Sequence, residues 1–244
     1  MLHASRFWKE HFAQNLNIQR VDWGLQPNLT PVERKAILYS LKAWQLGETS
    51  EGHHLLAAAR KYAARVGDLE YVEAVQLFIK EEQKHGSNLG RYIDLIGVQR
   101  AKKDWGDSLF RKVRYFNTSM ELWTLTVVIV ESAAQIFCQA LYDATSCPLL
   151  KAICNDILVD EAHHIKFQNE RLHIIFQRKG FYNRAFALLL YSGLFFAVIH
   201  AVWFGHRRAL KAGGVDHATF MRRMYYKFFG TVKFLHREAE PEVR

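Results

Sequence analysis

The sequence predicts an all-α protein, in which a four-helix bundle precedes an apolar helix and a basic amphipathic helix. Half of the 244 residues are apolar and only four are proline, so the chain favours long helices over loops. Helix start and stop signals recur at spacings that leave room for four long helices. No segment looks disordered, repeated or low in complexity, and the length is sufficient to bury a substantial core.

The first two helices are predicted to form a hairpin. Thr30-Pro31-Val32-Glu33 has the pattern of a capping box with proline at the first helical position. The helical pattern runs on to Gly67, and Asp68 caps a second helix that ends near Gly97. Residues 100–117 are basic and less regular, and we expect them to cross from one end of the bundle to the other, with room for one short helix.

A second hairpin is predicted to follow this crossover. Thr118 and Glu121 form another capping-box pattern, which opens a helix through about Thr145. Cys147-Pro148 begins a fourth helix, which ends near Gly180. Two hairpins joined by a long crossover differ from a simple up-down-up-down bundle.

The bundle is assigned to residues 30–180, with an N-terminal extension at 1–29 and a C-terminal helical extension at 181–244. Ala185 to Phe204 is almost uninterruptedly apolar and long enough to span a bilayer. A span would carry the lysines and arginines of residues 207–223 across the membrane, against the positive-inside tendency if the bundle is cytoplasmic. We therefore favour a helix packed on the bundle or dipped into one leaflet, followed by an interfacial amphipathic helix from Asp216 to His236.

Cysteine content and charge limit the setting. Cys138, Cys147 and Cys154 are an odd number without a CxxC motif, which indicates a reducing cytoplasm. Cys138 and Cys154 each lie eight residues from Ser146, and we expect both to face the core. Residues 1–20 are polar and do not resemble a secretory signal. The net charge of +9 is spread along the chain without a nucleic-acid motif, so we expect no nucleic-acid partner, and peripheral contact with a membrane surface stays open.

Two short motifs carry the chemistry. The second helix contains Glu82-Gln83-Lys84-His85, and the fourth contains Glu161-Ala162-His163-His164. In each motif the glutamate and the last histidine are at i and i+3, so they share a helix face and can reach one metal ion. One such pair is weak evidence, but two on the second helices of two hairpins predict a metal site.

Glu131 is the charged residue in a long apolar run of the third helix. Burying a lone carboxylate costs several kcal/mol unless it is paired or binds a metal, and the alternative is an exposed side chain on a mostly buried helix. Glu131 and Glu161 each lie 15 residues from Ser146, where the hairpin turns. They are therefore predicted to meet at equal depth.

The first helix offers two candidates for a fourth carboxylate. Glu48 lies 19 residues before Gly67 and Glu51 lies 16 before it, whereas Glu82 follows that glycine by 15. Glu51 and Glu82 lie at nearly equal distances along the chain from the turn at Gly67, which slightly favours Glu51 as the ligand. Glu48 and Glu51 are within one helical turn of each other, so both could line the site.

An acid precedes each ExxH motif. Glu81 and Asp160 are four residues before His85 and His164, respectively. They are predicted to hold the imidazole nitrogen that does not bind metal, with solvated helix charges as the alternative.

The order Glu, ExxH, Glu, ExxH over residues 30–180 resembles the ferritin-like di-iron carboxylate superfamily. Gly47-Glu48 is similar to the glycine–glutamate pair on the first helix of several members, which moves the choice of ligand to Glu48 and leaves Glu51 as a neighbour of the site. The resemblance implies two irons bridged by Glu82 and Glu161. One iron is then completed by Glu48 and His85, and the other by Glu131 and His164.

This resemblance implies a non-haem oxidase or oxygenase that activates dioxygen to oxidise an apolar small molecule with electrons from an external donor. Val127, Val128 and Ala134 share the face of Glu131 and predict apolar walls. Two iron ions are expected, although the same ligands accept manganese or a mixed Mn/Fe pair. The alternatives are a ferroxidase or peroxide-detoxifying protein without an organic substrate and a structural metal site. A homodimer stays open.

Overall fold

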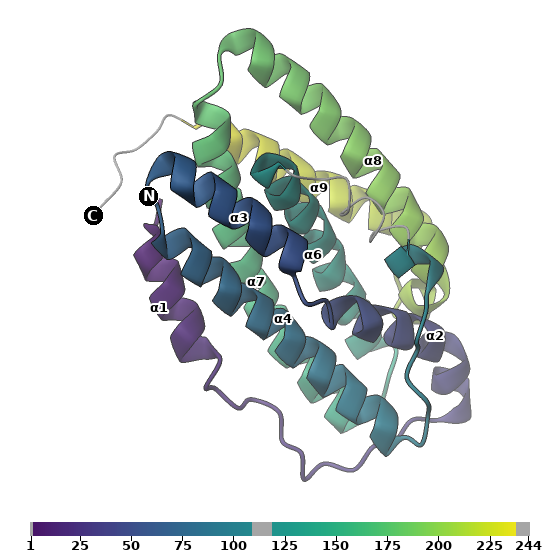
Figure 1. Ribbon diagram of the computed structural model, residues 1–244. Coiled ribbons are helices and arrows are strands. Elements are labelled where there is room, and N and C mark those ends of the chain that lie inside the picture. The colour runs from purple at the N-terminus through teal and green to yellow at the C-terminus, as the bar shows by residue number, and fades with distance from the viewer. Residues whose placement is uncertain (1, 109–118, 238–244) are drawn as a thin grey trace.

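The computed structural model describes residues 2–108 and 119–237, in which all regular secondary structure is helical (Figure 1). The helices are α1 (Ser5–Asn15), α2 (Pro31–Glu48), α3 (His53–Val66), α4 (Glu70–Leu95), α6 (Met120–Asp143), α7 (Pro148–Gln177), α8 (Phe181–Ala212) and α9 (His217–Leu235). Helices α2 and α3 together with α4, α6 and α7 form the bundle, and α4 packs against both α2 and α7. The predicted ferritin-like fold is confirmed.

Helix caps agree with the sequence signals where the structure describes them. The amide of Thr30 donates to Glu33 Oε2 over 2.8 Å, and the amide of Glu33 donates back to Thr30 Oγ1 over 3.3 Å, which completes the capping box. Asp216 accepts from the amide of Thr219 at the start of α9. Residues 109–118, including the predicted cap Thr118 and most of the crossover's second half, lie outside the described residues.

The predicted first helix is two helices. Residues between Glu48 and His53 leave the helical path, and Gly52 has a φ of +67°. A β-carbon on Gly52 would lie 2.6 Å from Ile79 Cδ1 of α4, so the close approach of α4 as well as the left-handed backbone requires glycine here. The single-helix prediction was wrong because the pattern on each side of this break is helical and only the packing against α4 reveals the turn.

The N-terminal residues belong to the packed structure. Helix α1 lies along α4 (Figure 1), with Trp8 and Phe12 buried in an aromatic cluster that includes Phe167 of α7. Cys138 and Cys154 are free and buried, as predicted, and Cys147 is free and buried as well.

Helix α8 is longer than its apolar run and has two different sides. Ala187, Tyr191, Phe195, Ile199 and Trp203 recur every four residues and are buried against the rest of the molecule, mainly α6, α2 and α9. Its other side is exposed along the edge of the molecule (Figure 1). The helix is therefore packed on the bundle along one stripe.

Candidate metal centre

Four helices bring six potential ligands together inside the bundle. Glu48 is at the end of α2, Glu131 is in the middle of α6, and the two ExxH motifs are on α4 and α7. The donor atoms form two groups, each with members within 4.8 Å of one another: Glu82, Glu131, Glu161 and His164, and Glu48, Glu82 and His85. Glu82 is common to both groups, which is the arrangement that a carboxylate bridging two ions requires.

The two histidines present the same nitrogen to the cluster. His164 Nδ1 lies 2.8 Å from Glu82 Oε1 and 3.6 Å from Glu161 Oε2. His85 Nδ1 lies 3.9 Å from Glu82 Oε1 and 3.8 Å from Glu161 Oε1. Both glutamates of the ExxH motifs therefore lie near both histidines.

Several donor atoms of this cluster are buried and lack well-aligned hydrogen bonds. Glu82 Oε1, both carboxylate oxygens of Glu161, and Nδ1 of His85 and His164 make no hydrogen bond of good geometry among the described residues, although His164 Nδ1 and Glu82 Oε1 lie within ion-pair distance. Unpaired buried polar atoms are costly, and several of them converging on one point are rare unless an ion satisfies them. Carboxylate oxygens with imidazole nitrogens suit iron and manganese. The donor set fits a dinuclear metal centre.

Two carboxyl groups in the cluster favour the protonated form. Burial raises the pKa of Glu48 well above its ordinary value, and the nearby Glu82 and Glu161 carboxylates raise it further. The pKa of Glu131 is also raised well above its ordinary value, mainly by burial and further by repulsion from the carboxylates of Glu161 and Glu82. These two groups keep their protons until a cation replaces them.

The pKa values of Glu82 and the two histidines are shifted in the direction that favours their charged forms. Burial opposes ionisation of Glu82, but attraction to His164 prevails and lowers its pKa to about 2. Burial also opposes charging of His164, yet Glu82, Glu161 and Glu81 outweigh it and raise the pKa well above its ordinary value. The pKa of His85 is raised as well, because hydrogen bonding to Asp160 outweighs burial. The raised pKa values of Glu48, Glu131, His85 and His164 all favour proton binding at the cluster.

The acids that precede the motifs hold the histidines from the outer side, but in a crossed arrangement. Asp160 Oδ2 of α7 lies 3.0 Å from Nε2 of His85 on α4. Glu81 Oε2 of α4 lies 2.8 Å from Nε2 of His164 on α7. The expectation that each acid serves the histidine of its own helix was wrong. With Nδ1 turned to the cluster, Nε2 points across to the facing helix.

A further layer of this network comes from the N-terminal segment, which the sequence analysis did not place near the site. Asn15 Nδ2 donates to Glu81 Oε1 and Asp160 Oδ1, each over 2.8 Å. Arg20 donates to Asp156 and Asp160 over 2.8 Å, and also to Asn15. The helical spacing of Trp8, Phe12 and Asn15 was the available signal that this segment packs on the bundle.

Glu51 does not lie beside the cluster. Its side chain is 77% exposed and pairs with His53 over 2.7 Å. The helix break places this residue on the surface, so the prediction of Glu51 as a neighbour of the ligands is corrected, and buried Glu48 is the carboxylate that the first segment supplies.

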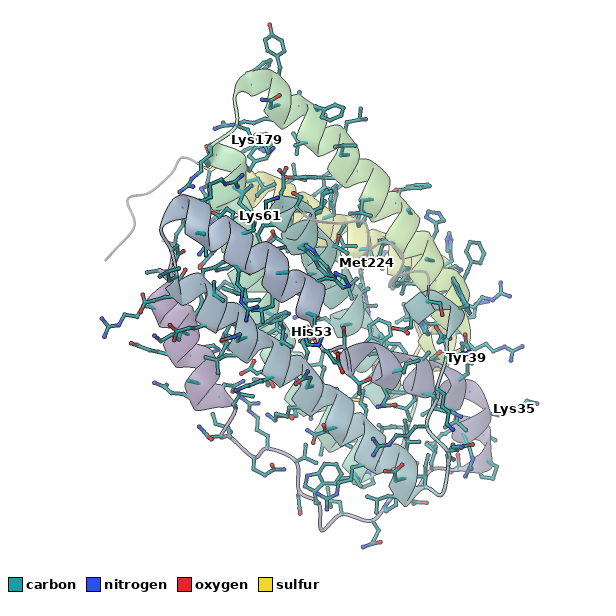
Figure 2. All side chains as sticks on the ribbon, viewed as in Figure 1. Lys35, Tyr39, His53, Lys61, Lys179 and Met224 are labelled. Carbon is teal, nitrogen blue, oxygen red and sulfur yellow. The ribbon has the colours of Figure 1, made fainter. Side chains whose placement is uncertain are left out.

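An apolar pocket of about 600 Å³ adjoins the cluster. Its lining includes three of the cluster's carboxylates, Glu48, Glu82 and Glu131, and its apolar walls come from α2, α3, α4, α6 and α8. The break between α2 and α3 also borders it, where His53 begins α3 (Figure 2). A small organic molecule of mostly apolar character can therefore lie beside the carboxylates.

Solved structures with the same fold are R2-like ligand-binding oxidases. One variant with an aerobically reconstituted Mn/Fe cofactor has a TM-score of 0.71 and 17% identity, over 97% of this chain and 98% of that chain. Another such variant has a TM-score of 0.69 and 16% identity, over 97% and 95% of the two chains. A form without metal cofactor has a TM-score of 0.66 and 18% identity, over 97% and 98%.

These similarities extend over nearly the whole chain and establish a ferritin-like fold. No protein-family model and no curated protein matches the sequence. The fold is therefore known from structure, whereas the activity has to be inferred from the site.

Proposed function

We propose that this protein is a non-haem dinuclear-metal oxidase or oxygenase that uses dioxygen to oxidise an apolar small molecule. The observation that carries the proposal is the contact between two features. A cluster of buried carboxylate and imidazole atoms, several of them without well-aligned hydrogen bonds, lies beside an apolar pocket whose lining includes three carboxylates of the cluster. The Mn/Fe cofactor in solved structures of the same fold supports the same chemistry.

The proposed ligands are Glu48, Glu82, His85, Glu131, Glu161 and His164. When bound, two redox-active ions supply electrons to dioxygen, and their proximity allows two electrons to be shared. Glu82 is common to both ligand groups and would be shared between them, and Glu161, which lies near both histidines, would complete the set. Either two iron ions or one manganese and one iron fit these donors.

The chain's own residues prepare this chemistry from two sides. Asp160 and Glu81 hold Nε2 of the two histidines, which leaves Nδ1 turned toward the ions. On the other side, Val127 and Val130 help to exclude water and to hold the apolar substrate near Glu131. Glu48 and Glu131 release their protons as cations bind.

The pocket is also the observation that favours an organic substrate over iron storage. A ferroxidase needs a polar path for incoming cations, whereas the lining here is mainly apolar and includes Trp44, Phe78 and Trp123. In this proposal an external donor returns electrons to the site after each turnover.

The test is metal analysis of the purified protein, followed by anaerobic loading with Fe(II), or with Mn(II) and Fe(II), and mixing with dioxygen in a stopped-flow spectrometer. We expect about two ions per chain, a transient visible absorption band, and an apolar molecule in the organic extract of the protein. No bound metal, or one ion inert to dioxygen, contradicts the proposal. Repeated oxidation of many Fe(II) ions per chain would instead identify a ferroxidase.

A further inference from the structure

The outer side of α8 is a mainly apolar surface. Phe181 and Tyr182 are 80% and 85% exposed, and Phe186, Leu189, Leu190, Phe196 and Phe204 continue along the same helix at 47–69%. We call these seven side chains the α8 outer face. Aromatic and leucine side chains with this exposure over about 36 Å of helix need a covering partner.

The polar groups on this side of α8 are satisfied within the helix. Ser192 Oγ donates to the carbonyl of Leu188 over 2.9 Å, and His200 Nδ1 lies 2.8 Å from the carbonyl of Phe196. Helix α8 contains no aspartate or glutamate. The α8 outer face therefore offers a neighbour hydrophobic contact without requiring hydrogen bonds from it.

Positive charge is concentrated in the same part of the chain. Residues 181–237 contain nine lysines and arginines but only one acidic residue. Residues 1–180 contain 23 lysines and arginines and 20 acidic residues, so their charges nearly balance. The one acid, Asp216, is occupied as the cap of α9. Exposed basic residues stand at the end of α8 and on α9, namely Arg207, Arg208, Lys211, Arg222, Arg223 and Lys233.

Helix α9 extends the surface with aromatic residues. Tyr226 and Phe229 are 81% and 63% exposed. Tyr225 contacts Phe195 of α8 with ring centroids 5.3 Å apart and stacks on Phe229, so these rings lie next to α8. Apolar helices bordered by aromatic and basic side chains are typical of proteins that lie in the interface of an anionic membrane.

Length and composition would also allow a true span, but packing argues against it. Among the described residues, two helices are long and apolar enough to cross a membrane. The most apolar stretch of α6 is 83% buried inside the molecule, and that of α8 is 22% buried. α6 is a core helix. The stripe of α8 from Ala187 to Trp203 is packed on the bundle, so lipid cannot surround α8 without also covering the charged bundle.

We propose that the α8 outer face inserts into one leaflet of an anionic bilayer, with the basic residues of α8 and α9 at the lipid headgroups. A second copy of the chain is the competing occupant. Two α8 helices packed face to face would place the exposed Arg207 and Arg208 of both copies beside the contact without an acidic residue in either helix to pair with them. Anionic lipid complements the charge that a second copy repels.

With the α8 outer face in the leaflet, the pocket would lie close to the membrane. The route of substrate entry described next rests on the proposed function. Leu194, Val198 and Val202, on a neighbouring stripe of α8, line the pocket beside the carboxylate cluster. One helix would thus separate the acyl chains from the pocket. Apolar molecules dissolved in the leaflet would then enter beside α8.

Vesicle flotation tests the docking without requiring metal or turnover. The full chain is mixed with vesicles of phosphatidylcholine alone or with phosphatidylglycerol added, at low and high salt. We expect binding to the anionic vesicles that weakens with salt. Combined Phe186→Ser, Leu189→Ser and Phe196→Ser substitutions should reduce binding at least about tenfold, because three apolar anchors are lost.

Matched variants separate this effect from general surface polarity. Val32 and Leu69 are 80% and 69% exposed but lie at the starts of α2 and α4, so changing them to serine should leave binding unchanged. Arg222→Gln with Arg223→Gln should weaken binding to anionic vesicles. The same change of Arg60 and Lys61 on α3 (Figure 2) should not.

Light scattering and metal analysis of the same proteins complete the test. A chain that binds neither kind of vesicle but forms a dimer that the α8 triple variant dissociates would overturn the proposal in favour of a second copy. Equal losses in the α8 and control variants would also overturn it. Metal content should stay unchanged in the triple variant, so failure of membrane docking is distinguishable from failure of the metal centre.

Discussion

The two sides of the metal cluster differ in chemistry. Toward α1, the outer nitrogens of His85 and His164 are tied to Asp160 and Glu81, which are tied in turn to Asn15 and the Arg20 segment. Toward α2, α6 and α8, the same cluster borders an apolar pocket. The polar side can fix the ligands because its groups are buried and paired, and the apolar side leaves room for a molecule.

The largest effect is expected from removing a ligand. Glu131→Ala or His85→Ala should abolish binding of two ions per chain, because each takes a donor from the cluster. Elemental analysis after gel filtration measures this, with circular dichroism to establish that the helices remain. Glu51→Ala is the control, since that glutamate is exposed and should leave metal content intact. Unchanged metal content in both ligand variants would remove the site assignment.

A smaller loss should follow from weakening the polar side. Glu81→Gln and Asp160→Asn keep the shape but remove the charge that orients the histidines, and such changes typically cost about 10–100-fold in metal affinity. Competition with a chelator gives the affinity. If both variants bind metal as tightly as the natural protein, the crossed pairs have no role in tuning the ligands.

Metal affinity should rise with pH by about tenfold per unit for each proton released. The sign follows from the raised pKa values of Glu48, Glu131, His85 and His164, which favour the protonated forms of these groups before a cation binds. A cation has to displace these protons, so acid weakens binding. A pH-indicator dye in weak buffer detects the released protons, and metal uptake without acidification would contradict this electrostatic account.

Asn15→Ala tests the N-terminal contribution. The substitution leaves Glu81 and Asp160 each without one buried hydrogen bond, which should lower the free energy of unfolding by about 1–3 kcal/mol with little change in metal stoichiometry. Urea denaturation of the metal-free protein measures the loss. Asn17→Ala, on an exposed residue just after the same helix, is the matched control.

The smallest effect on metal is expected on the apolar side. Val127→Phe fills part of the pocket without touching the polar network, so metal content should stay at two ions while apolar ligand binding is lost. Val127→Ala enlarges the pocket and should retain binding. Mass spectrometry of organic extracts compares the variants, and equal amounts of bound molecule would place the ligand elsewhere.

The sequence by itself determined the bundle and the candidate ligands. The capping box at Thr30, the proline at position 148 and the i, i+3 spacing of each ExxH motif are local features, so they are readable without the fold. Glu131 stood out because an isolated carboxylate in an apolar helix is costly to bury. Depth matching alone did not choose Glu48 over Glu51; the family resemblance supplied that choice.

Tertiary structure decided the features that depend on contacts between distant segments. The break at Gly52 depends on the approach of Ile79, and it moves Glu51 to the surface. The crossing of Glu81 to His164 and of Asp160 to His85 depends on how α4 faces α7, and Asn15 reaches both acids because α1 lies along α4. Helical periodicity determines which residues share a face, whereas only packing determines what that face meets.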